Sequence, residues 1–327
     1  MRTGTTLKGA VLLAAALLLA VVAGGCAQKG AKARDYPNKP VTMIQIFTAG
    51  GPLDVQSRVV EKYWKEYFNN QPLVFDYKVG AGGQVGMTEI ARANPDGYTI
   101  GGFSFPHIVL QSLGPQATFK LEDFAFIAQL VCDPTVLAVN KNSTIKTLSD
   151  FIAEANRKNG EMTVGIVGTL SGHHLALLKM TDLLNIKVKP VVFPGSADCN
   201  TALRGGHIDA QVGNLTDVIR NQDAFRPIAI ASEKRHPWLP DVPTFRELGY
   251  DLISDVRRGY AAPAGIDPAI LKKLRDGITA ICQKPEYLED MKKAGLWVEF
   301  MSGEEFYQFA ARFREEALAI IQKHGLI

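Results

Sequence analysis

Cysteine is scarce in this sequence. Four cysteines occur among 327 residues, and one of them, Cys26, lies near the N-terminus. The other three, Cys132, Cys199 and Cys282, are an odd number, and their spacing fits no metal-binding motif. We therefore predict that these three are small buried apolar side chains, and we expect no metal site.

Net charge and nucleotide-binding motifs are also lacking. The formal net charge is +3, and it falls to +1 (3 − 2) if Arg2 and Lys8 are removed with a leader. A nearly neutral protein gives no electrostatic reason to bind nucleic acid. The chain contains neither a G-x-x-x-x-G-K-[ST] phosphate loop nor a G-x-G-x-x-G dinucleotide fingerprint. We therefore expect no nucleic-acid partner and no cofactor.

A basic start and a short apolar run mark the N-terminus. The run over 10–23 ends in Ala23-Gly24-Gly25-Cys26. A run of this length followed by small residues is typical of a secretion signal, whereas the alternative, a transmembrane anchor, needs ~20 apolar residues. Small residues directly before a cysteine are similar to the lipobox of bacterial lipoproteins, although Ala23 replaces the usual leucine. We predict a lipoprotein signal peptide over 1–26, lipidation of Cys26 and a tether over 27–35.

Strand-like and helix-like segments alternate beyond the leader. We expect strands at 41–47, 73–77, 98–103, 126–131, 135–139, 163–167, 189–193, 210–212 and 227–231. We expect helices at 54–69, 84–93, 148–159, 171–184, 197–204, 268–283, 285–294 and 304–324. This alternation predicts an α/β fold with a mostly parallel sheet covered by helices on both faces. The length suits two domains of roughly 100–200 residues each.

Five turns follow predicted strands, and parallel sheets bind ligands at the carboxyl ends of their strands. These turns lie at 48–53, 79–83, 104–107, 168–174 and 194–197, and four of them contain glycine. Asp54 is the predicted N-cap of the first long helix, so the amides of Gly50 and Gly51 before it have no intrahelical acceptor. The sequence Gly80-Ala81-Gly82-Gly83 repeats this arrangement before the next helix. Two such helix starts facing each other can hold a carboxylate, although the alternative is that both are plain tight turns.

The sequence Ser171-Gly172-His173-His174 opens another predicted helix. Adjacent helical residues point about 100° apart, so both rings would rarely reach one metal ion, and we expect one ring inside and the other facing the cleft. Ser171 beside histidine also suggests nucleophilic catalysis. The G-x-S-x-G elbow is absent, however, because Gly168-Thr-Leu-Ser171-Gly has the wrong spacing.

Arg257-Arg258 is a basic pair next to the apolar segment 259–262. Two interpretations remain open at this point. Either the pair lies on the surface and is balanced by Asp251 and Asp255, or one guanidinium reaches the cleft.

A series of short motifs runs in order along the chain. They are Tyr36-Pro37-x-Lys39-Pro40, Phe47-x-x-Gly50-Gly51-x-x-Asp54, Gly80-Ala81-Gly82-Gly83-x-x-Gly86, Ala93-x-Pro95-Asp96-Gly97-Tyr98-Thr99, Leu239-Pro240-Asp241-Val242-Pro243-Thr244, Gly249-Tyr250 and Ala262-Pro263-Ala264-Gly265. With this series, the chain from Tyr36 to its end resembles the extracytoplasmic solute receptors of tripartite tricarboxylate transporters, often called Bug receptors. The resemblance implies a two-lobed Venus-flytrap fold of the type 2 periplasmic binding proteins, with two crossing strands. It places 36–133 and 255–327 in lobe 1 and 134–254 in lobe 2.

The resemblance also implies a ligand site. In relatives, backbone amides of the first two glycine turns and ordered waters hold the ligand's carboxylate, and the second lobe supplies the remaining contacts. Together with the turns and basic residues above, we expect the ligand-binding residues to be Thr48, Ala49, Gly50, Gly51, Leu53, Gly80, Ala81, Gly82, Gly83, Ser104, Gly168, Ser171, His173, His174, Gly195, Ser196, Asn214, Arg257 and Arg258.

Several positions depart from the family pattern. Pro52 and Leu53 stand where relatives usually have glycine and threonine, and proline removes an N–H donor. His173 replaces a small hydroxyl residue, Pro194 stands where a basic residue is frequent, and Arg257-Arg258 replaces an aromatic pair. These departures concern the identity of the ligand more than the fold.

The expected function is therefore capture, not catalysis. We expect a receptor that encloses a small carboxylic acid, a di- or tricarboxylate by family resemblance, and delivers it to the membrane permease subunits of a tripartite tricarboxylate transporter. Such a receptor is extracytoplasmic, either lipid-anchored to the membrane or periplasmic. One alternative is a sensing module for a signalling partner, which neighbouring permease genes would argue against. A less favoured alternative is a Ser/His hydrolase, which predicts turnover that is lost with Ser171→Ala.

Overall fold

The computed structural model of the chain describes residues 35–326. The predicted signal peptide, Cys26 and nearly all of the tether lie outside these residues. None of the helices within 35–326 combines the length and apolarity that crossing a bilayer requires. The three cysteines after the leader are buried and unpaired, which confirms their prediction as small core residues.

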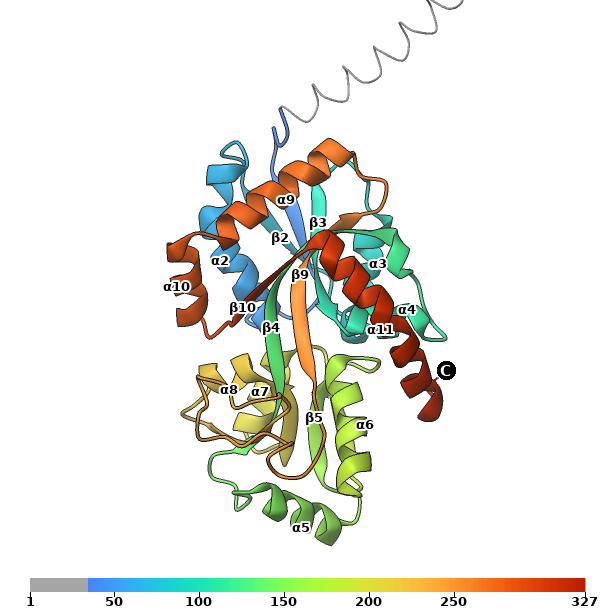
Figure 1. Cartoon of the computed structure of the whole chain (residues 1–327), viewed down its shortest axis with the longest axis vertical. Helices are drawn as coiled ribbons and strands as arrows, with labels where there is room; N and C mark the ends of the chain where they lie inside the picture. Colours follow the sequence, from blue (N-terminus) through green and yellow to red (C-terminus); the bar gives the residue numbers. More distant parts are fainter. Residues whose placement is uncertain (1–34, 327) are drawn as a thin grey trace, which may run out of the picture.

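The molecule has two lobes stacked along its long axis, and two long strands run from one lobe into the other (Figure 1). We use the predicted boundaries, lobe 1 as 36–133 plus 255–327 and lobe 2 as 134–254, as a working division. The strands form one continuous mixed sheet in the order β2-β1-β3-β9-β4-β7-β5-β6, and β8 and β10 pair with β4 beside this path.

Lobe 1 is built around a parallel trio of strands. Its elements are β1 (Val41–Gln45), α2 (Pro52–Tyr67), β2 (Leu73–Tyr77), η1 (Ala81–Gly83), α3 (Gln84–Arg92), β3 (Thr99–Phe105), α4 (His107–Leu113), η2 (Leu121–Asp123), α9 (Pro268–Cys282), α10 (Pro285–Lys293), β10 (Val298–Ser302) and α11 (Gly303–Lys323). One core cluster lies between the sheet and helices α2, α9 and α10, and it contains Trp64 stacked on Phe68. A second cluster, rich in phenylalanine, lies under α4 and α11.

Lobe 2 repeats the strand–helix alternation. Its elements are α5 (Leu148–Lys158), β5 (Thr163–Val167), α6 (Gly172–Leu184), β6 (Lys189–Phe193), α7 (Ser196–Arg204), β7 (Ala210–Asn214), α8 (Leu215–Arg220) and β8 (Phe225–Ile230). Apolar side chains of β5, β7 and β8 pack against α5 and α6 on one face of the sheet. Apolar side chains of β8 and of the strand over 124–140 pack against α7 and α8 on the other face. The sheet is therefore covered on both faces, as the alternation predicts.

The crossing strands are β4 (Phe124–Asn140) and β9 (Asp255–Pro263). Residues 124–134 of β4 pair with β9, whereas Thr135 and the residues after it pair with β7 and β8. All ladders that involve β4 or β9 are antiparallel, and the ladders of β1 with β2 and β3 and of β5 with β6 and β7 are parallel. The sheet is thus parallel at its two ends and antiparallel in the middle. The reason is that β4 carries the chain from lobe 1 into lobe 2 and β9 carries it back.

Several predicted elements differ from the structure. The separate strands expected at 126–131 and 135–139 are one strand, because Pro134 sits within β4 opposite Asp255 and does not end it. The sequence prediction missed the short helices α4 and α8 and the strand β10. Each is only five to seven residues long, so its apolar periodicity covers less than two helical turns or three strand repeats.

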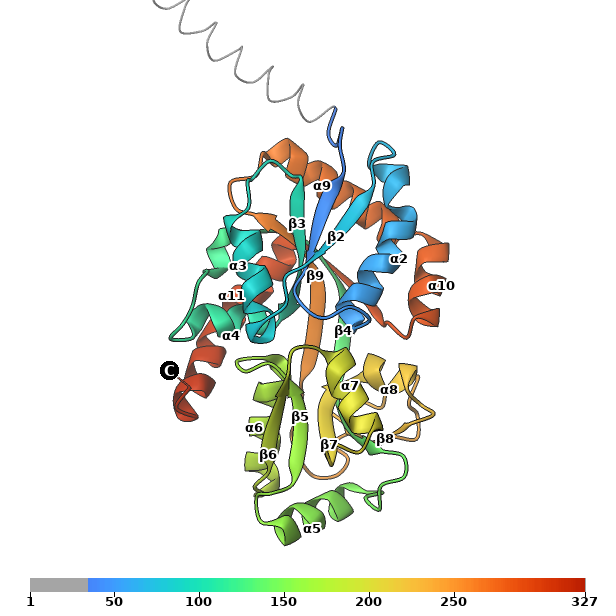
Figure 2. The ribbon, with the colours of Figure 1, turned by 180° about the vertical axis from the view of Figure 1, so that it is seen from behind.

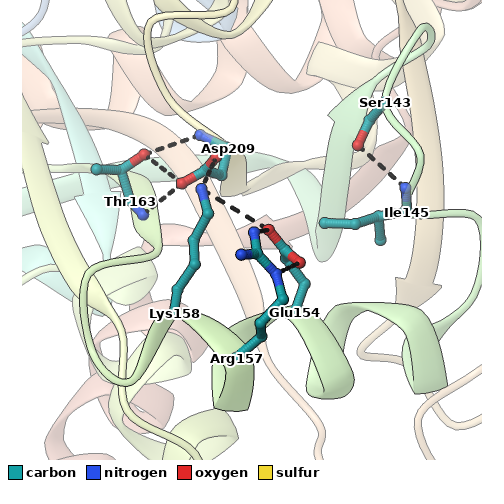
Figure 3. Close-up of polar contacts among 7 residues, drawn as sticks. All are labelled: Ser143, Ile145, Glu154, Arg157, Lys158, Thr163 and Asp209. Atoms are coloured by element: carbon teal, nitrogen blue, oxygen red, sulfur yellow. Dashed lines mark hydrogen bonds and ion pairs between the residues drawn. The ribbon is translucent and has the colours of Figure 1, made fainter.

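At the end of lobe 2 far from lobe 1, Asp209 ties two elements together (Figure 3). Its carboxylate accepts hydrogen bonds from the N–H and hydroxyl of Thr163, at 2.8 and 2.9 Å, and from Nζ of Lys158 at 2.6 Å. Lys158 also lies 3.9 Å from Glu154, which Arg157 holds by a two-bonded ion pair. Burial alone would raise the pKa of Asp209, but these hydrogen bonds and the Lys158 charge outweigh burial, and the net shift is downward.

We expect Asp209→Asn to lower the melting temperature at pH 7. The lowered pKa means that the ionised Asp209 stabilises the fold above its unfolded-state pKa of about 3.9, and that this contribution disappears as the pH falls through the folded-state value. The melting curves of the two proteins should therefore converge below about pH 4. A difference that stays constant as the pH falls from about 4 to about 2 would contradict the assigned role.

Candidate functional site

A cavity lies between the lobes, where the turns after several strands meet the crossing strands. Its volume is about 20 Å³, enough for about one or two water molecules, so the lobes must move apart to admit a ligand. Lobe 1 lines it with Phe47, Gly51, Pro52, Leu53, Ser104, His107, Val256 and Arg258. Lobe 2 lines it with Val167, His173, Ser196 and Asn214. Both lobes are needed to form the cavity.

The turn before α2 contributes backbone donors, but the helix begins earlier than predicted. Helix α2 starts at Pro52 with Gly51 as its N-cap, so the prediction of Asp54 as the N-cap is wrong. Asp54 lies in the first turn and accepts the N–H of Gly50 at 2.8 Å. Within residues 35–326, no acceptor is found for the N–H of Leu53, which lines the cavity. The amide of Leu53 is therefore a free donor at the cavity, whereas the amides of Gly50 and Gly51 are already used.

The second glycine turn, Gly80 to Gly83, lies outside the lining of the cavity. A side chain at Gly83 would meet Phe47 and Ile46, and a side chain at Gly82 would meet the backbone of Gly168 in lobe 2. The structure thus places this turn behind Phe47 and against lobe 2. The role of its amides as ligand donors stays a prediction.

The guanidinium of Arg258 is the cation of the cavity. Arg258 is 3% exposed, and its Nη1 donates to Oδ2 of Asp133 on β4 at 2.8 Å. Oδ1 of Asp133 accepts the N–H of Thr216 at 3.1 Å, so both oxygens accept and the carboxylate is ionised. Burial raises the pKa of Asp133, and the Arg258 charge opposes that shift. A guanidinium has five N–H donors. Only one hydrogen bond from the guanidinium of Arg258 to another residue of 35–326 is found, the bond to Asp133.

His107 begins α4 and presents one donor to the cavity. The N–H of Gly172 lies 3.4 Å from its Nδ1, and the hydroxyl of Ser104 lies 3.1 Å from the same atom. A backbone N–H can only donate, so Nδ1 is the acceptor and the proton resides on Nε2. Burial lowers the pKa of His107 well below its usual value, and nearby His173 and Arg258 add to this shift. His107 is therefore a neutral ring.

His173, in the first turn of α6, also carries its proton on Nε2, but here a bond from Nε2 fixes the tautomer. Nδ2 of Asn214 donates to Asp217 at 3.1 Å, so Oδ1 of Asn214 faces the ring and accepts from Nε2 of His173 at 3.0 Å. Nδ1 of His173 is then an acceptor, and it has no partner among the described residues. Burial lowers the pKa of His173, which keeps this ring neutral as well.

Other residues of the predicted site lie outside the lining of the cavity, within one lobe or at the contact between the lobes. Ser171 caps α6, because its hydroxyl accepts the N–H of His174 and donates to the carbonyl of Gly168. The ring of His174 turns toward α11 among leucine and isoleucine side chains. Gly195, the N-cap of α7, lies against Thr48 of lobe 1. The hydroxyl of Ser171 is fully occupied, so the geometry of a nucleophile is not formed there.

The two arginines of the basic pair diverge, because successive strand residues point to opposite faces. Arg257 forms ion pairs with Asp255 and Glu299 at 3.1 and 3.0 Å, and its guanidinium lies over the ring of Phe309. It does not line the cavity. Arg258 lines the cavity, and its contact with a ligand stays a prediction.

The sequence prediction of site residues omitted two polar side chains, His107 and Asp133. His107 lies three residues after Ser104 at the carboxyl end of a strand, a position that could have indicated it. Asp133 had no local signal, because its role depends on pairing of β4 with β9. The apolar lining residues Phe47, Pro52, Val167 and Val256 were also missed.

Contacts outside the cavity join the lobes, and we call them the closure rim. On the face shown in Figure 2, the starts of α2 and α7 approach each other, and Thr48 donates to Asp198 at 2.9 Å. Arg220 donates to the carbonyl of Gly50 at 2.9 Å. On the other side α11 lies beside α6 (Figure 1), where the ion pairs are Lys179–Glu316 at 3.4 Å and Lys323–Asp182 at 2.8 Å.

Two lobes, two crossing strands and a polar cavity between them define the class of two-lobed solute-binding proteins. Residues 57–326 match the tripartite tricarboxylate transporter family receptor, and the chain belongs to this family. It is 30% identical to the protein BugT of Bordetella pertussis over 270 residues, which is 80% of this chain and 81% of BugT.

Solved structures agree with this assignment. A periplasmic transporter is 27% identical, with a TM-score of 0.83 over 89% of this chain and 99% of its own. MatC from Rhodopseudomonas palustris with bound malate is 24% identical, with a TM-score of 0.81 over 88% of this chain and 100% of its own. The family resemblance and the two-lobed α/β fold predicted from the sequence are confirmed. The family is one of binding receptors, not of enzymes.

Proposed function

We propose that this protein captures a small carboxylic acid in the cavity between its lobes and delivers it to the permease subunits of a tripartite tricarboxylate transporter. The acid's carboxylate binds the free N–H groups of Arg258 and the amide of Leu53. Closing of the lobes removes the acid from water and creates a surface that a permease recognises.

The single observation that carries this proposal is a guanidinium that is buried with most of its donors unused. Asp133 accepts one bond from it, and leaving its other buried N–H donors without acceptors is costly, so the oxygens of a ligand would complete the site. A carboxylate matches the planar fork of arginine with two parallel hydrogen bonds, each charge-assisted. Helix α6 also starts near the cavity and has no acidic residue in its first turn, so its N-terminus favours an anion.

Ring donors and acceptors around Arg258 supply the remaining polar contacts. Nε2–H of His107 and the hydroxyl of Ser196 are suited to a second oxygen of the ligand, and Phe47 and Val256 cover its apolar part. MatC binds malate within the same fold, which supports an acid as the ligand class. A sensing role uses the same cavity, and the presence or absence of permease genes beside this one distinguishes the two.

Calorimetry against a panel of mono-, di- and tricarboxylates tests the proposal. We expect at least one small acid to bind with micromolar affinity, which corresponds to about 8 kcal/mol. A panel of sugars and amines of similar size is the control, and it should release no heat. If no acid changes the heat or the melting temperature, the proposal fails.

The second part of the proposal is the membrane anchor at Cys26, which follows from the sequence alone. In a bacterial host we expect labelled palmitate to be incorporated into the full-length chain, and the chain to sediment with membranes. Cys26→Ser should abolish the labelling and release the protein. Cys132→Ser is the matched control, because Cys132 is buried in the fold. Equal labelling of the wild type and Cys26→Ser would contradict the anchor.

A further inference from the structure

Positive charge is scarce in the cavity. Among the described residues that line it, Arg258 is the only cationic side chain, and Asp133 already pairs with it. Directly behind the lining residue Asn214 lies a second carboxylate, Asp217, which is 2% exposed. Asp217 accepts the N–H and Nδ2 of Asn214, at 3.0 and 3.1 Å, and Nδ2 of Asn200 at 2.8 Å. Together, the side chains of Arg258, Asp133 and Asp217 carry one positive and two negative charges.

The helix N-termini near the cavity are largely matched by acids of the chain itself. Asp54 lies in the first turn of α2, and Asp198 lies in the first turn of α7, where it accepts the hydroxyl of Thr48. An acidic side chain in the first turn offsets the partial positive charge of a helix start. Helix α6 has no acid in its first turn and places His173 there instead.

Neither histidine supplies a positive charge. Nδ1 of His107 accepts a backbone N–H, which a protonated Nδ1 could not do. If Nδ1 of His173 were protonated, its N–H would find no hydrogen-bond acceptor among the described residues. Burial lowers the pKa values of both rings, in agreement with this geometry.

From this distribution of charges we infer that the cleft selects acids that carry a single negative charge, and that it admits a dicarboxylate only together with one proton. The inference rests on the proposed function and refines the di- or tricarboxylate that the family resemblance implies. A monoanion is matched by the free donors of Arg258. A second carboxylate would lie in a closed cavity beside Asp217 and Asp133 with no further cation, which is unfavourable.

The proton that accompanies a dianion has a small number of possible sites. They are the rings of His107 and His173, the Asp133 carboxyl, and the second carboxyl group of the ligand itself. Because these groups interact, the pH dependence reports the whole cluster rather than one residue.

Matched pairs of acids test the inference. Succinate and succinamate have the same length and nearly the same shape, but at pH 8 succinate carries two charges and succinamate carries one. Adipate and its monoamide form a second, longer pair. For the pair that fits the cavity, calorimetry at pH 8 should show the monoamide binding at least about tenfold more tightly than the diacid, which equals about 1.4 kcal/mol.

Proton uptake gives an independent readout. Titrations of the diacid in two buffers with different ionisation enthalpies should show uptake of about one proton, and its affinity should rise by up to about tenfold per pH unit between pH 8 and pH 6. The monoamide should show little uptake and little pH dependence over the same range.

Asp133→Asn tests the origin of the preference, because it removes one negative charge at nearly constant shape. We expect the ratio of monoamide to diacid affinity to fall toward one or to reverse. Asp255→Asn is the matched control, since Asp255 pairs with Arg257 away from the cavity, and it should leave the ratio unchanged. If Asp133→Asn does not fold, the proton count on the wild-type protein decides.

The outcomes separate this inference from the proposed function. A diacid that binds at pH 8 as tightly as its monoamide, without proton uptake, overturns the inference and leaves the receptor function intact. Failure of every acid in the panel to bind overturns both.

Discussion

Replacing Arg258 by glutamine is expected to weaken binding of the best small acid by about 100-fold or more. Charge-assisted hydrogen bonds contribute about 1.5–3 kcal/mol each, and the fork of Arg258 is positioned to make two of them. Glutamine retains one donor group but no charge. Arg258→Lys should fall between the two, because it keeps the charge and loses the fork. Calorimetry with the acid identified in the panel measures each effect.

Two controls keep the Arg258 result interpretable. Arg257→Gln removes the neighbouring guanidinium, which faces Asp255 and Glu299, and should change affinity by less than about twofold. Arg258→Gln also leaves Asp133 buried without its partner, which costs stability by about 3–5 kcal/mol. The double variant Arg258→Gln/Asp133→Asn should be more stable than Arg258→Gln alone, but its affinity for the acid should stay low. Wild-type affinity in the double variant would exclude Arg258 as the anchor.

The second large effect is expected from Gly168→Ala, which should hold the lobes apart. Gly168 follows β5, and a methyl group there would fall within contact distance of the backbone of Gly82 in lobe 1. Backbone cannot move aside as a flexible side chain can, so the closed cleft would not form. We expect affinity to fall by about tenfold or more, since part of the binding surface is lost. Small-angle scattering with saturating acid should show a larger radius of gyration than for the wild type.

Gly206→Ala is the matched control for this variant. Gly206 also lies in lobe 2 and has φ of +70°, close to the +69° of Gly168, but a methyl group there meets nothing within 4 Å. Both variants therefore share the cost of a non-glycine residue in the left-handed region, about 1–2 kcal/mol. Only Gly168→Ala adds the clash between lobes. If the two variants bind equally well, the contact between Gly82 and Gly168 does not limit closure.

Much of the architecture could be predicted from the sequence, because the elements that carry it are long. Helices such as α2 and α11 span four to six turns, and their apolar periodicity is unambiguous. Short elements carry too few repeats to be recognised, which is why α4, α8 and β10 were missed. The central strand β4 was divided at Pro134 because a proline within a strand removes a ladder donor, whereas here its neighbours continue the pairing on both sides.

Of the two glycine turns predicted to hold the ligand, only the first lines the cavity between the lobes, through Gly51. The ligand contacts of both turns stay predictions. Which amides are free could not be predicted, because Asp54 uses the N–H of Gly50 in a way that depends on where α2 begins. The Arg258–Asp133 pair joins residues 125 positions apart, and only the register of β4 against β9 brings them together.

The contacts of the closure rim affect how tightly this protein binds every ligand, but not which ligand it prefers. Thr48 with Asp198 and Lys323 with Asp182 stabilise the shut arrangement without touching the cavity. Any change in the strength of these contacts shifts the equilibrium between open and shut forms, and it multiplies the affinity for every ligand by the same factor. Substitutions at the rim can therefore adapt the receptor to scarce or abundant nutrients while its choice among acids is preserved.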